Sequence, residues 1–338
     1  MVKNISFFAF LVILFVYIPF RGAADTGTAG KDPPGDPPPG GHIWSLGFRS
    51  GVLWGGTREQ VFREAGSDDL LSRLDWELKP LVYFGAVLGM DSAGKKERGG
   101  FFQDLGLSVG VPMDNGTLED RDWEIPGVLT QFSRHPAATI NALLLDYRLG
   151  FSLPAGYRSS FNFFLFFSWN HFSWVGRDGY GQYTDPPAPW TPGIPKDYNR
   201  FRGKDVIRYA QDWVVPGLGW GMDFSLLKNL DAGVSLLFSP LVLAVDKDEH
   251  FLNKDTVFRD YLWGGFFLEA SFSFALALSP GTRLRVKTAS RVISGSRGNT
   301  YIWQPRDVFL GGSADTAGAY ISYVSAELTF EWALGKSF

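Results

Sequence analysis

The sequence predicts an all-β protein: a ten-stranded antiparallel up-and-down transmembrane β-barrel with long extracellular loops. Three observations predict this fold class. Apolar residues recur at every second position, the connections alternate between short and long, and the chain opens with a secretory targeting segment. The composition agrees, because aromatic residues make up 16% of the 338 residues and hydrophobic residues 45%, as half-apolar strands with aromatic girdles require.

The composition also excludes several kinds of site. With no cysteine, the chain has no disulfide framework, no thiolate metal site and no cysteine nucleophile. The 35 acidic and 32 basic residues give a net charge of −3, which argues against a broad nucleic-acid-binding surface. We therefore expect no nucleic-acid partner. We also expect no metal and no cofactor.

The first residues have the pattern of a signal peptide. Lys3 precedes an apolar run from 7 to 20, and the small residues Gly22 and Ala24 follow it. This order predicts a signal peptide over 1–24. The alternative is a short membrane anchor, but the run is shorter than the roughly 20 apolar residues that a spanning helix needs. The next segment, 25–41, is rich in Pro and Gly and reads as a linker, which leaves 42–338 as the folded part.

The first strand shows the alternation that a membrane barrel requires. One face carries Trp44, Leu46, Phe48 and Trp54, while Arg49 lies on the other. The two tryptophans are separated by about 25 Å along the membrane normal, at roughly 3.3 Å per residue and a tilt of about 40°. That is the height of the apolar band of an outer-membrane barrel. A soluble β-sandwich would also alternate, but it has less reason to place large rings at both edges of such a band.

Ten segments show this alternation, an even number as in bacterial barrels. The predicted strands are 43–54, 72–88, 101–113, 139–151, 157–170, 206–224, 232–245, 257–278, 282–293 and 317–332. The long connections between them are 55–71, 114–138, 176–205, 246–256 and 294–316. With a signal peptide, this pattern predicts the bacterial outer membrane, with short turns in the periplasm and long loops outside.

Most of the candidate functional residues lie in these long loops. They are Glu59, Asp120, Asp122, Ser133, His135, Asp246, Asp248 and His250. The alternation predicts that Glu59, Asp120 and Asp122 point inward. Simple extrapolation would send the residues at 246, 248 and 250 toward lipid, which is unfavourable for charged groups. We therefore predict a one-residue phase shift near Ser239-Pro240, where proline cannot join the hydrogen-bond ladder.

Two acidic groupings suggest hydrolysis. Asp248 and His250 place a carboxylate beside an imidazole on one strand face, and Asp120 with Asp122 forms a second acidic pair. Such groups could hold a water and polarise it for attack on a carbonyl, although acidic loop residues are more often simply solvated. Ser133-Arg134-His135 permits a serine-protease interpretation, but the sequence places no third carboxylate beside it. No HExxH, phosphate-loop or GxSxG motif is present.

Six short strings, in order along the chain, resemble the omptins, a family of ten-stranded outer-membrane endopeptidases. The strings are Thr57-Arg58-Glu59, Leu71-Ser72-Arg73-Leu74-Asp75-Trp76, Asp120-Arg121-Asp122-Trp123, Ser133-Arg134-His135-Pro136, Asp246-Lys247-Asp248-Glu249-His250 and Gly298-Asn299-Thr300. The resemblance covers roughly residues 43–330 and implies a protease with a water nucleophile.

The resemblance also implies residue roles. His250 would be the general base, Asp248 its orienting partner, and Asp120 with Asp122 would position the water. Glu59 and Asp246 would form the acidic pocket that selects Arg or Lys before the cut. Ser133 and His135 match positions near the site that are neither nucleophile nor base. The family's acidic residue before the Ser-Arg-His-Pro string is Gln131 here, so we expect a relaxed preference after the cut.

The expected partners are basic peptides or proteins and outer-membrane lipid. Of the residues with which omptins bind lipopolysaccharide, only Tyr157 is retained, which puts dependence on that lipid in doubt. The alternative function is a non-catalytic barrel, an adhesin or a small pore, that binds basic ligands at its rim. A pore is disfavoured because side chains are expected to fill the lumen; those expected there are Arg49, Asp75, Glu77, Lys79, Asp104 and Asp146. A soluble periplasmic β-domain is a third alternative. The sequence does not settle the physiological substrate or the oligomeric state.

Overall fold

The computed structural model describes residues 42–92, 99–156, 158–305 and 308–334. Its strands are β1 (His42–Phe62), β2 (Leu70–Ser92), β3 (Gly100–Gly110), β4 (Met113–Asp122), β5 (Gln131–Pro154), β6 (Ser159–Arg177), β7 (Tyr180–Gln182), β8 (Asp205–Leu227), β9 (Leu230–Ser239), β10 (Leu243–His250), β11 (Thr256–Trp263), β12 (Phe266–Ser279), β13 (Thr282–Gln304) and β14 (Val308–Leu334). The signal peptide and linker predicted over 1–41 lie outside the described residues, as does Tyr157.

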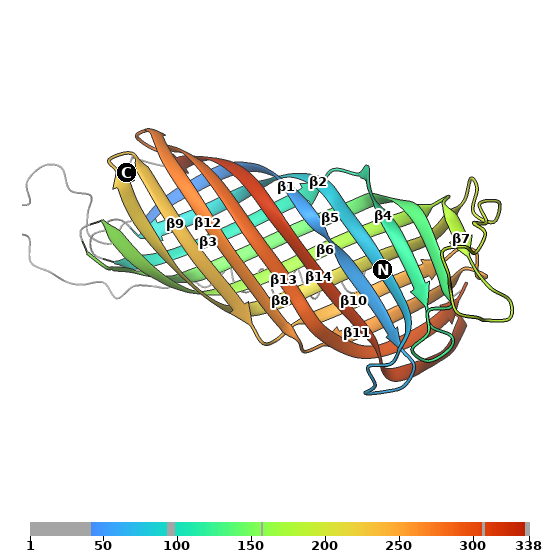
Figure 1. Ribbon diagram of the computed structural model, residues 1–338. Coiled ribbons are helices and arrows are strands. Elements are labelled where there is room, and N and C mark those ends of the chain that lie inside the picture. Colours follow the sequence, from blue (N-terminus) through green and yellow to red (C-terminus); the bar gives the residue numbers. More distant parts are fainter. Residues whose placement is uncertain (1–41, 93–98, 157, 306–307, 335–338) are drawn as a thin grey trace, which may run out of the picture. The chain divides into compact units, whose positions relative to one another are not determined.

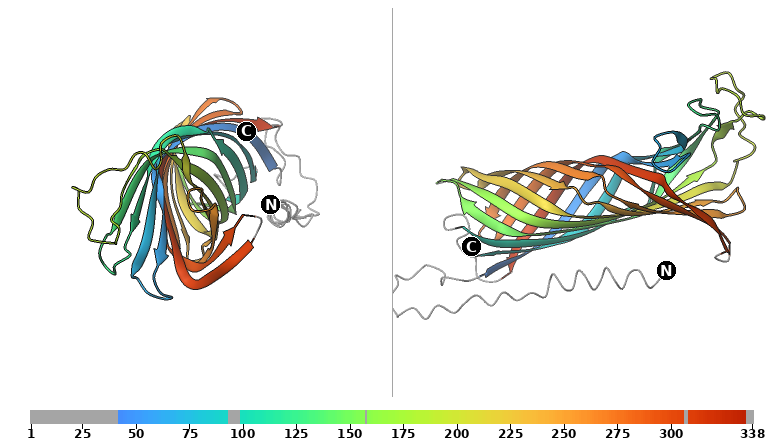
Figure 2. Two further views of the ribbon diagram at one scale, coloured as in Figure 1. Left: turned by 90° about the vertical axis from the view of Figure 1, so that its right-hand side faces the viewer. Right: turned by 90° about the horizontal axis from the view of Figure 1, so that it is seen from below.

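These strands form one antiparallel sheet that closes on itself (Figure 1). The ring closes where β1 pairs with both β2 and β14. We call each stretch of chain that runs from one end of the barrel to the other a pass. Three passes consist of two successive strands each: β3 with β4, β9 with β10, and β11 with β12. The three-residue β7 pairs with β5. Within the described residues the ring therefore has ten passes, and the predicted barrel is confirmed (Figure 2). No helix in this part of the chain is long and apolar enough to cross a membrane.

One predicted strand is divided. The segment predicted as a single strand over 257–278 ends at Trp263 and resumes at Phe266. Gly264 and Gly265 lie between, with φ of 80° and 74°, a region that side chains other than glycine rarely adopt. A Cβ on Gly265 would also lie 2.2 Å from the carbonyl oxygen of Ser294. The two glycines therefore allow the wall to bend between its membrane part and its outer part.

The predicted outward face of the first strand is confirmed. Trp44, Leu46, Phe48 and Trp54 are exposed on the barrel wall, whereas Arg49 is only 7% exposed. The strand over Phe266–Ser279 behaves in the same way, with its even-numbered rings outside. These exposed apolar side chains form a band around the wall, and we take the strand segments that carry this band as the membrane-spanning ones.

The strands run well beyond this band toward the end that holds the predicted long loops. The loops predicted over 55–71, 114–138 and 246–256 are in large part strand, because β1 continues to Phe62, β4 to Asp122 and β10 to His250. All of the predicted site residues therefore lie on strands rather than on loops. A hydrogen-bonded strand holds a side chain more rigidly than a loop does, which suits a catalytic site.

Below that end, buried rings fill the lumen. The rings of Trp76 and Tyr209 stack with centroids 5.7 Å apart, and Trp174 lies 5.9 Å from Tyr209. Trp213 and Phe172 are also fully buried beside them. We call this group of five residues the aromatic floor. It gives the site a low-dielectric base, where charge interactions are stronger than in water.

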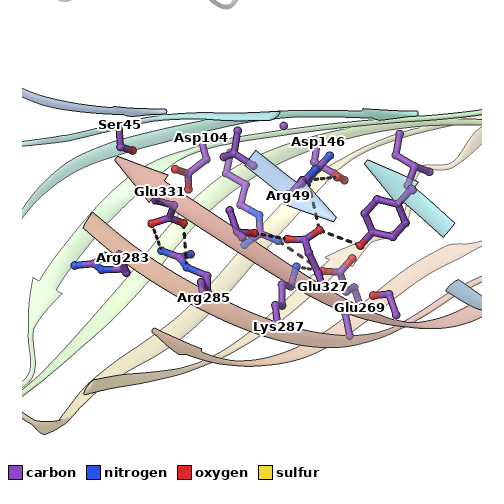
Figure 3. Close-up of a pocket in the computed structure, with 18 of the residues that line it drawn as sticks. Ser45, Arg49, Asp104, Asp146, Glu269, Arg283, Arg285, Lys287, Glu327 and Glu331 are labelled. Atoms are coloured by element: carbon purple, nitrogen blue, oxygen red, sulfur yellow. Dashed lines mark hydrogen bonds and ion pairs between the residues drawn. The ribbon is translucent and has the colours of Figure 1, made fainter. Parts of the chain in front are cut away.

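A polar cavity of about 170 Å³ lies in the lumen (Figure 3). Glu269 is its most enclosed carboxylate, 1% exposed, and accepts a 2.8 Å hydrogen bond from Arg291. Lys287 lies 3.2 Å from it and Arg148 3.6 Å. Arg49 and Asp146 line the same cavity as predicted, with Arg49 Nη1 3.7 Å from Asp146 Oδ2. Paired charges of both signs thus occupy the lumen.

Three residues predicted for the lumen are elsewhere. Asp75, Glu77 and Lys79 face outward, because the even-numbered residues from Leu74 to Leu78 point into the barrel. Beyond Pro80 the odd-numbered residues point inward instead, and the register with β1 shifts at the same level. Proline has no N–H to donate to the ladder, so it is found at such irregularities. The prediction was wrong because it placed the odd-numbered residues on the inner face on both sides of Pro80. Asp104 lines the cavity, as expected.

Candidate functional site

β10 brings three of the predicted site residues to the inner face of the barrel. Asp246 and Asp248 are 1% and 3% exposed, and His250 follows them on the same face. This orientation depends on the predicted phase shift. Along β9 the exposed residues are even-numbered, whereas Leu241, Leu243 and Val245 are exposed beyond Pro240. The shift lies where it was predicted, between the end of β9 at Ser239 and the start of β10 at Leu243.

Asp248 and His250 contact each other directly. Nε2 of the imidazole donates a hydrogen bond to Oδ2 of the carboxylate. Burial opposes a charge on the imidazole, but the carboxylates of Asp248, Asp120 and Asp122 outweigh it and raise the pKa of His250 to about 9. Asp248 therefore both orients the ring and stabilises its protonated form.

β4 supplies the second acidic group. Asp120 and Asp122 point inward as predicted, in register with Ser133 and Gln131 of β5. Burial and the charge of Asp122 raise the pKa of Asp120 well above its ordinary value, and burial also raises the pKa of Asp122. Two like charges in a desolvated site are unfavourable, so the two carboxyl groups titrate as a pair that retains a proton more readily than free carboxylates.

A third acidic group lies above the aromatic floor. Glu59 of β1 is 2% exposed and Asp246 of β10 is 1% exposed. Burial, together with the nearby carboxylates of Asp248 and Asp246, raises the pKa of Glu59 well above its ordinary value. The hydroxyl of Tyr209 donates a 2.8 Å hydrogen bond to Oδ2 of Asp246. That bond fixes the carboxylate of Asp246 from the side of the aromatic floor.

Hydrogen bonds continue from Tyr209 across the barrel. Gln211 Nε2 donates to the Tyr209 hydroxyl over 2.7 Å, and its Oε1 accepts from Trp213 Nε1 at 2.8 Å and from Thr57 Oγ1 at 2.6 Å. Thr57 lies two residues before Glu59 on β1. This chain of bonds therefore links the two strands that carry Glu59 and Asp246, and a buried hydrogen-bond network of this kind rigidifies what it supports.

Ser133 and His135 form a separate pair beside the site. His135 Nδ1 donates to the backbone carbonyl of Asp178, and its Nε2 lies 2.9 Å from Ser133 Oγ. The serine hydroxyl is therefore the donor in the second bond. Burial lowers the pKa of His135, so the ring is neutral at neutral pH. The group that accepts a hydrogen bond from Nδ1 of His135 is thus a backbone carbonyl, and not the carboxylate that a Ser-His-Asp triad has at this place.

Gln131, at which we expect a relaxed preference after the cut, is the first residue of β5. Its side chain donates a 2.7 Å hydrogen bond to Glu124.

Two residues near the site were not found by sequence reasoning. Burial raises the pKa of Tyr183, in the segment that connects β6 to β8, to about 12, and the charges of Asp120 and Asp122 also raise it. Asp260 of β11 is 3% exposed and lies in register with Asp246. Its place within an alternating strand offered a signal, because an acidic residue on the inner face next to a predicted acidic site is unusual.

The described residues contain no group of three His, Cys, Asp or Glu side chains placed to hold a metal ion. The catalytic candidates on β4 and β10 also act on one another electrostatically, since Asp120 and Asp122 both shift the pKa of His250. The geometry thus unites residues that are far apart in sequence.

Comparison with known proteins assigns the family. The omptin family model matches residues 43–332. The chain belongs to the omptin family. Protease 7 of Escherichia coli O157:H7 is 24% identical over 79% of this chain and 83% of its own length. The outer membrane protease IcsP of Shigella flexneri is 24% identical over 82% of this chain and 86% of its own. These relatives place this omptin among outer-membrane proteases.

A solved structure shows the same fold. The crystal structure of the outer membrane protease OmpT from Escherichia coli superposes with a TM-score of 0.76 at 18% identity, and covers 86% of this chain and 97% of that one. At that identity the likeness concerns the fold. For this omptin it means that the closed barrel shares its fold with an outer-membrane protein of solved structure.

Proposed function

We propose that this omptin is an outer-membrane endopeptidase that cleaves after Arg or Lys with a water activated by Asp248 and His250. The observation that carries the proposal is the hydrogen bond between Asp248 and His250, on a strand face shared with Asp246. The acidic pair of β4 acts on the same imidazole. The names of the relatives support a peptidase, and the residues named here supply its chemistry.

In the proposed reaction, the water lies between His250 and the carboxyl pair of Asp120 and Asp122. His250 accepts a proton as the water oxygen bonds to the scissile carbonyl carbon, and Asp248 stabilises the imidazolium that forms. The proton shared by the carboxyl pair hydrogen-bonds to the tetrahedral intermediate. His250 then donates its proton to the leaving nitrogen as the C–N bond breaks, which returns the imidazole to its neutral form.

The acidic pocket gives the proposed reaction its specificity. Glu59 and Asp246 are almost fully buried, so they face a substrate in a desolvated setting where opposite charges attract strongly. A cationic side chain in that pocket also disfavours a proton on nearby His250, which its raised pKa otherwise retains. Binding of the basic side chain therefore favours loss of the proton from His250, and a neutral His250 in turn favours binding of the cation.

The test is cleavage of a fluorogenic peptide with one internal Arg by the refolded barrel. Asp122→Asn and His250→Ala are each expected to lower kcat by at least about a hundredfold, as for loss of a general acid or base. Matched controls are Asp114→Asn, an exposed position on β4, and His171→Ala, whose ring bonds Asp212. Equal rates for the wild type and both site variants would rule out the proposed mechanism.

A further inference from the structure

β11 brings a third carboxylate to the acidic pocket. Asp260 is the direct cross-strand partner of Asp246, and its side chain is 3% exposed on the inner face of the barrel. It acts electrostatically on both Glu59 and Asp246. The pocket is therefore lined by acidic groups from three strands, β1, β10 and β11.

Each of these carboxylates keeps one oxygen without a partner. Glu59 Oε2, Asp246 Oδ1 and Asp260 Oδ1 are buried and make no hydrogen bond to any described residue. No Lys or Arg in the described part of the chain forms an ion pair with any of the three. Burying several acidic oxygens with neither hydrogen-bond donors nor cations is unfavourable. Their free oxygens indicate a ligand that brings both positive charge and N–H donors.

The spacing of the three groups limits which cation fits. Around the ring, β14 and β13 separate Glu59 from Asp260, and at this level β14 presents the small buried side chains of Ala317 and Ala319. These alanines place no large side chain on the wall between Glu59 and Asp260. The described residues also include no acidic triad close enough for a metal ion. A larger organic cation that spreads its charge over several atoms suits the pocket better.

Arginine and lysine differ in the chemistry of their cationic groups. A guanidinium is planar and offers five N–H donors in a fixed fork, so it can face three carboxylates at once. An ammonium is a compact point charge with three donors and keeps its water more tightly. We propose that Asp260 is a specificity residue of the pocket, and that it makes this omptin select arginine over lysine before the cut. This inference rests on the proposed peptidase function.

The experiment compares two peptides that differ only in Arg or Lys before the scissile bond. For the wild type, kcat/KM is expected to be higher for Arg, and Asp260→Asn is expected to reduce the Arg-to-Lys ratio by about tenfold, the effect of one charged hydrogen bond. Asp260→Glu restores the charge and is expected to recover part of the ratio. The control is Asp255→Asn, which removes the same charge from an exposed position five residues earlier.

Binding measurements separate this inference from the peptidase proposal. Butylguanidine and hexylamine are titrated by calorimetry into wild type and Asp260→Asn, with folding checked by electrophoretic mobility before and after heating. Selective loss of butylguanidine binding in Asp260→Asn supports the inference even if no peptide is cleaved. An unchanged Arg-to-Lys ratio, or equal binding of both probes by the two proteins, overturns it whether or not peptides are cleaved.

Discussion

The carboxylate of Asp248 accepts a hydrogen bond from the imidazole of His250, two residues further along β10, and both side chains lie on the inner face of that strand. A two-residue spacing on a strand is enough for this contact, because alternate side chains point the same way. The pair is thus fixed by one local segment, while the groups that surround it come from β1, β4 and β11.

The first prediction concerns the proton on His250. Asp248→Asn removes the largest of the influences that raise the pKa of His250, so the pKa should fall from about 9 toward the ordinary value of 6.5. The measurement is a titration of the histidine ring carbons by NMR in detergent micelles. Asp255→Asn should leave the midpoint unchanged. A midpoint that stays near 9 in Asp248→Asn would show that the carboxylate does not hold the proton in place.

The second prediction concerns the base of the acidic pocket. Tyr209→Phe removes the donor of the 2.8 Å hydrogen bond to Asp246 and leaves the ring in the aromatic floor. Because the bond positions a substrate-binding group and not the reacting atoms, KM should rise by roughly tenfold with little change in kcat. Steady-state kinetics on the Arg peptide measure both constants.

The control for that change is Tyr261→Phe, which alters the same residue type on the outer wall of β11. It should have no effect on either constant. A large fall in kcat with KM unchanged in Tyr209→Phe would contradict the assignment, since it would place the hydroxyl in the chemical step.

Local patterns explain what the sequence could predict. Period-two alternation follows from strand geometry alone, so the outward face of β1 and the inward positions of Glu59, Asp120 and Asp122 could be predicted. The phase shift after Ser239 was predictable because charges at the lipid face are costly and a proline stood at the required place. These inferences need only the energetics of one strand in its membrane.

Non-local features explain what it could not predict. Asp260 acts electrostatically on Glu59 only because the ring closes with a particular stagger between strands, which no single segment encodes. Tyr183 reaches the site from a long connection. The shift at Pro80 could not be predicted, because Asp75, Glu77 and Lys79 lie on the outer wall above the apolar band. Water and ion pairs satisfy charged side chains there, so their residue type does not distinguish the outer wall from the lumen. Asp75, for example, bonds Arg58 Nε and Arg73 Nε, each at 2.8 Å.

The third prediction distinguishes a water nucleophile from a serine nucleophile. Ser133→Ala should keep kcat within about tenfold of the wild type, whereas His250→Ala should not. The reason is structural: the ring of His135 donates to the carbonyl of Asp178, so no carboxylate stabilises an imidazolium there as a catalytic triad requires. The assay also asks whether a serine-directed phosphonate labels the wild-type protein. Stoichiometric labelling of Ser133 with loss of activity would reverse the assignment.

The fourth prediction concerns the charges inside the membrane-spanning part of the barrel. Glu269 is 1% exposed and is surrounded by Arg291, Lys287 and Arg148 at 2.8, 3.2 and 3.6 Å. Glu269→Gln leaves buried cations without their counter-charge, which should destabilise the barrel by about 3–5 kcal/mol. Urea unfolding of the barrel in lipid vesicles, followed by tryptophan fluorescence, measures the change.

The matched control for the lumen is Glu249→Gln, which breaks ion pairs to Arg208 and Lys247 at 3.6 and 3.5 Å on the outer wall. Exposed pairs contribute little, so this change should shift the free energy of unfolding by less than about 1 kcal/mol. Equal effects of the two substitutions would mean that water screens the lumen as fully as it screens the surface. In that case the lumen would be hydrated rather than closed by its ion pairs, which would favour the alternative of a small pore.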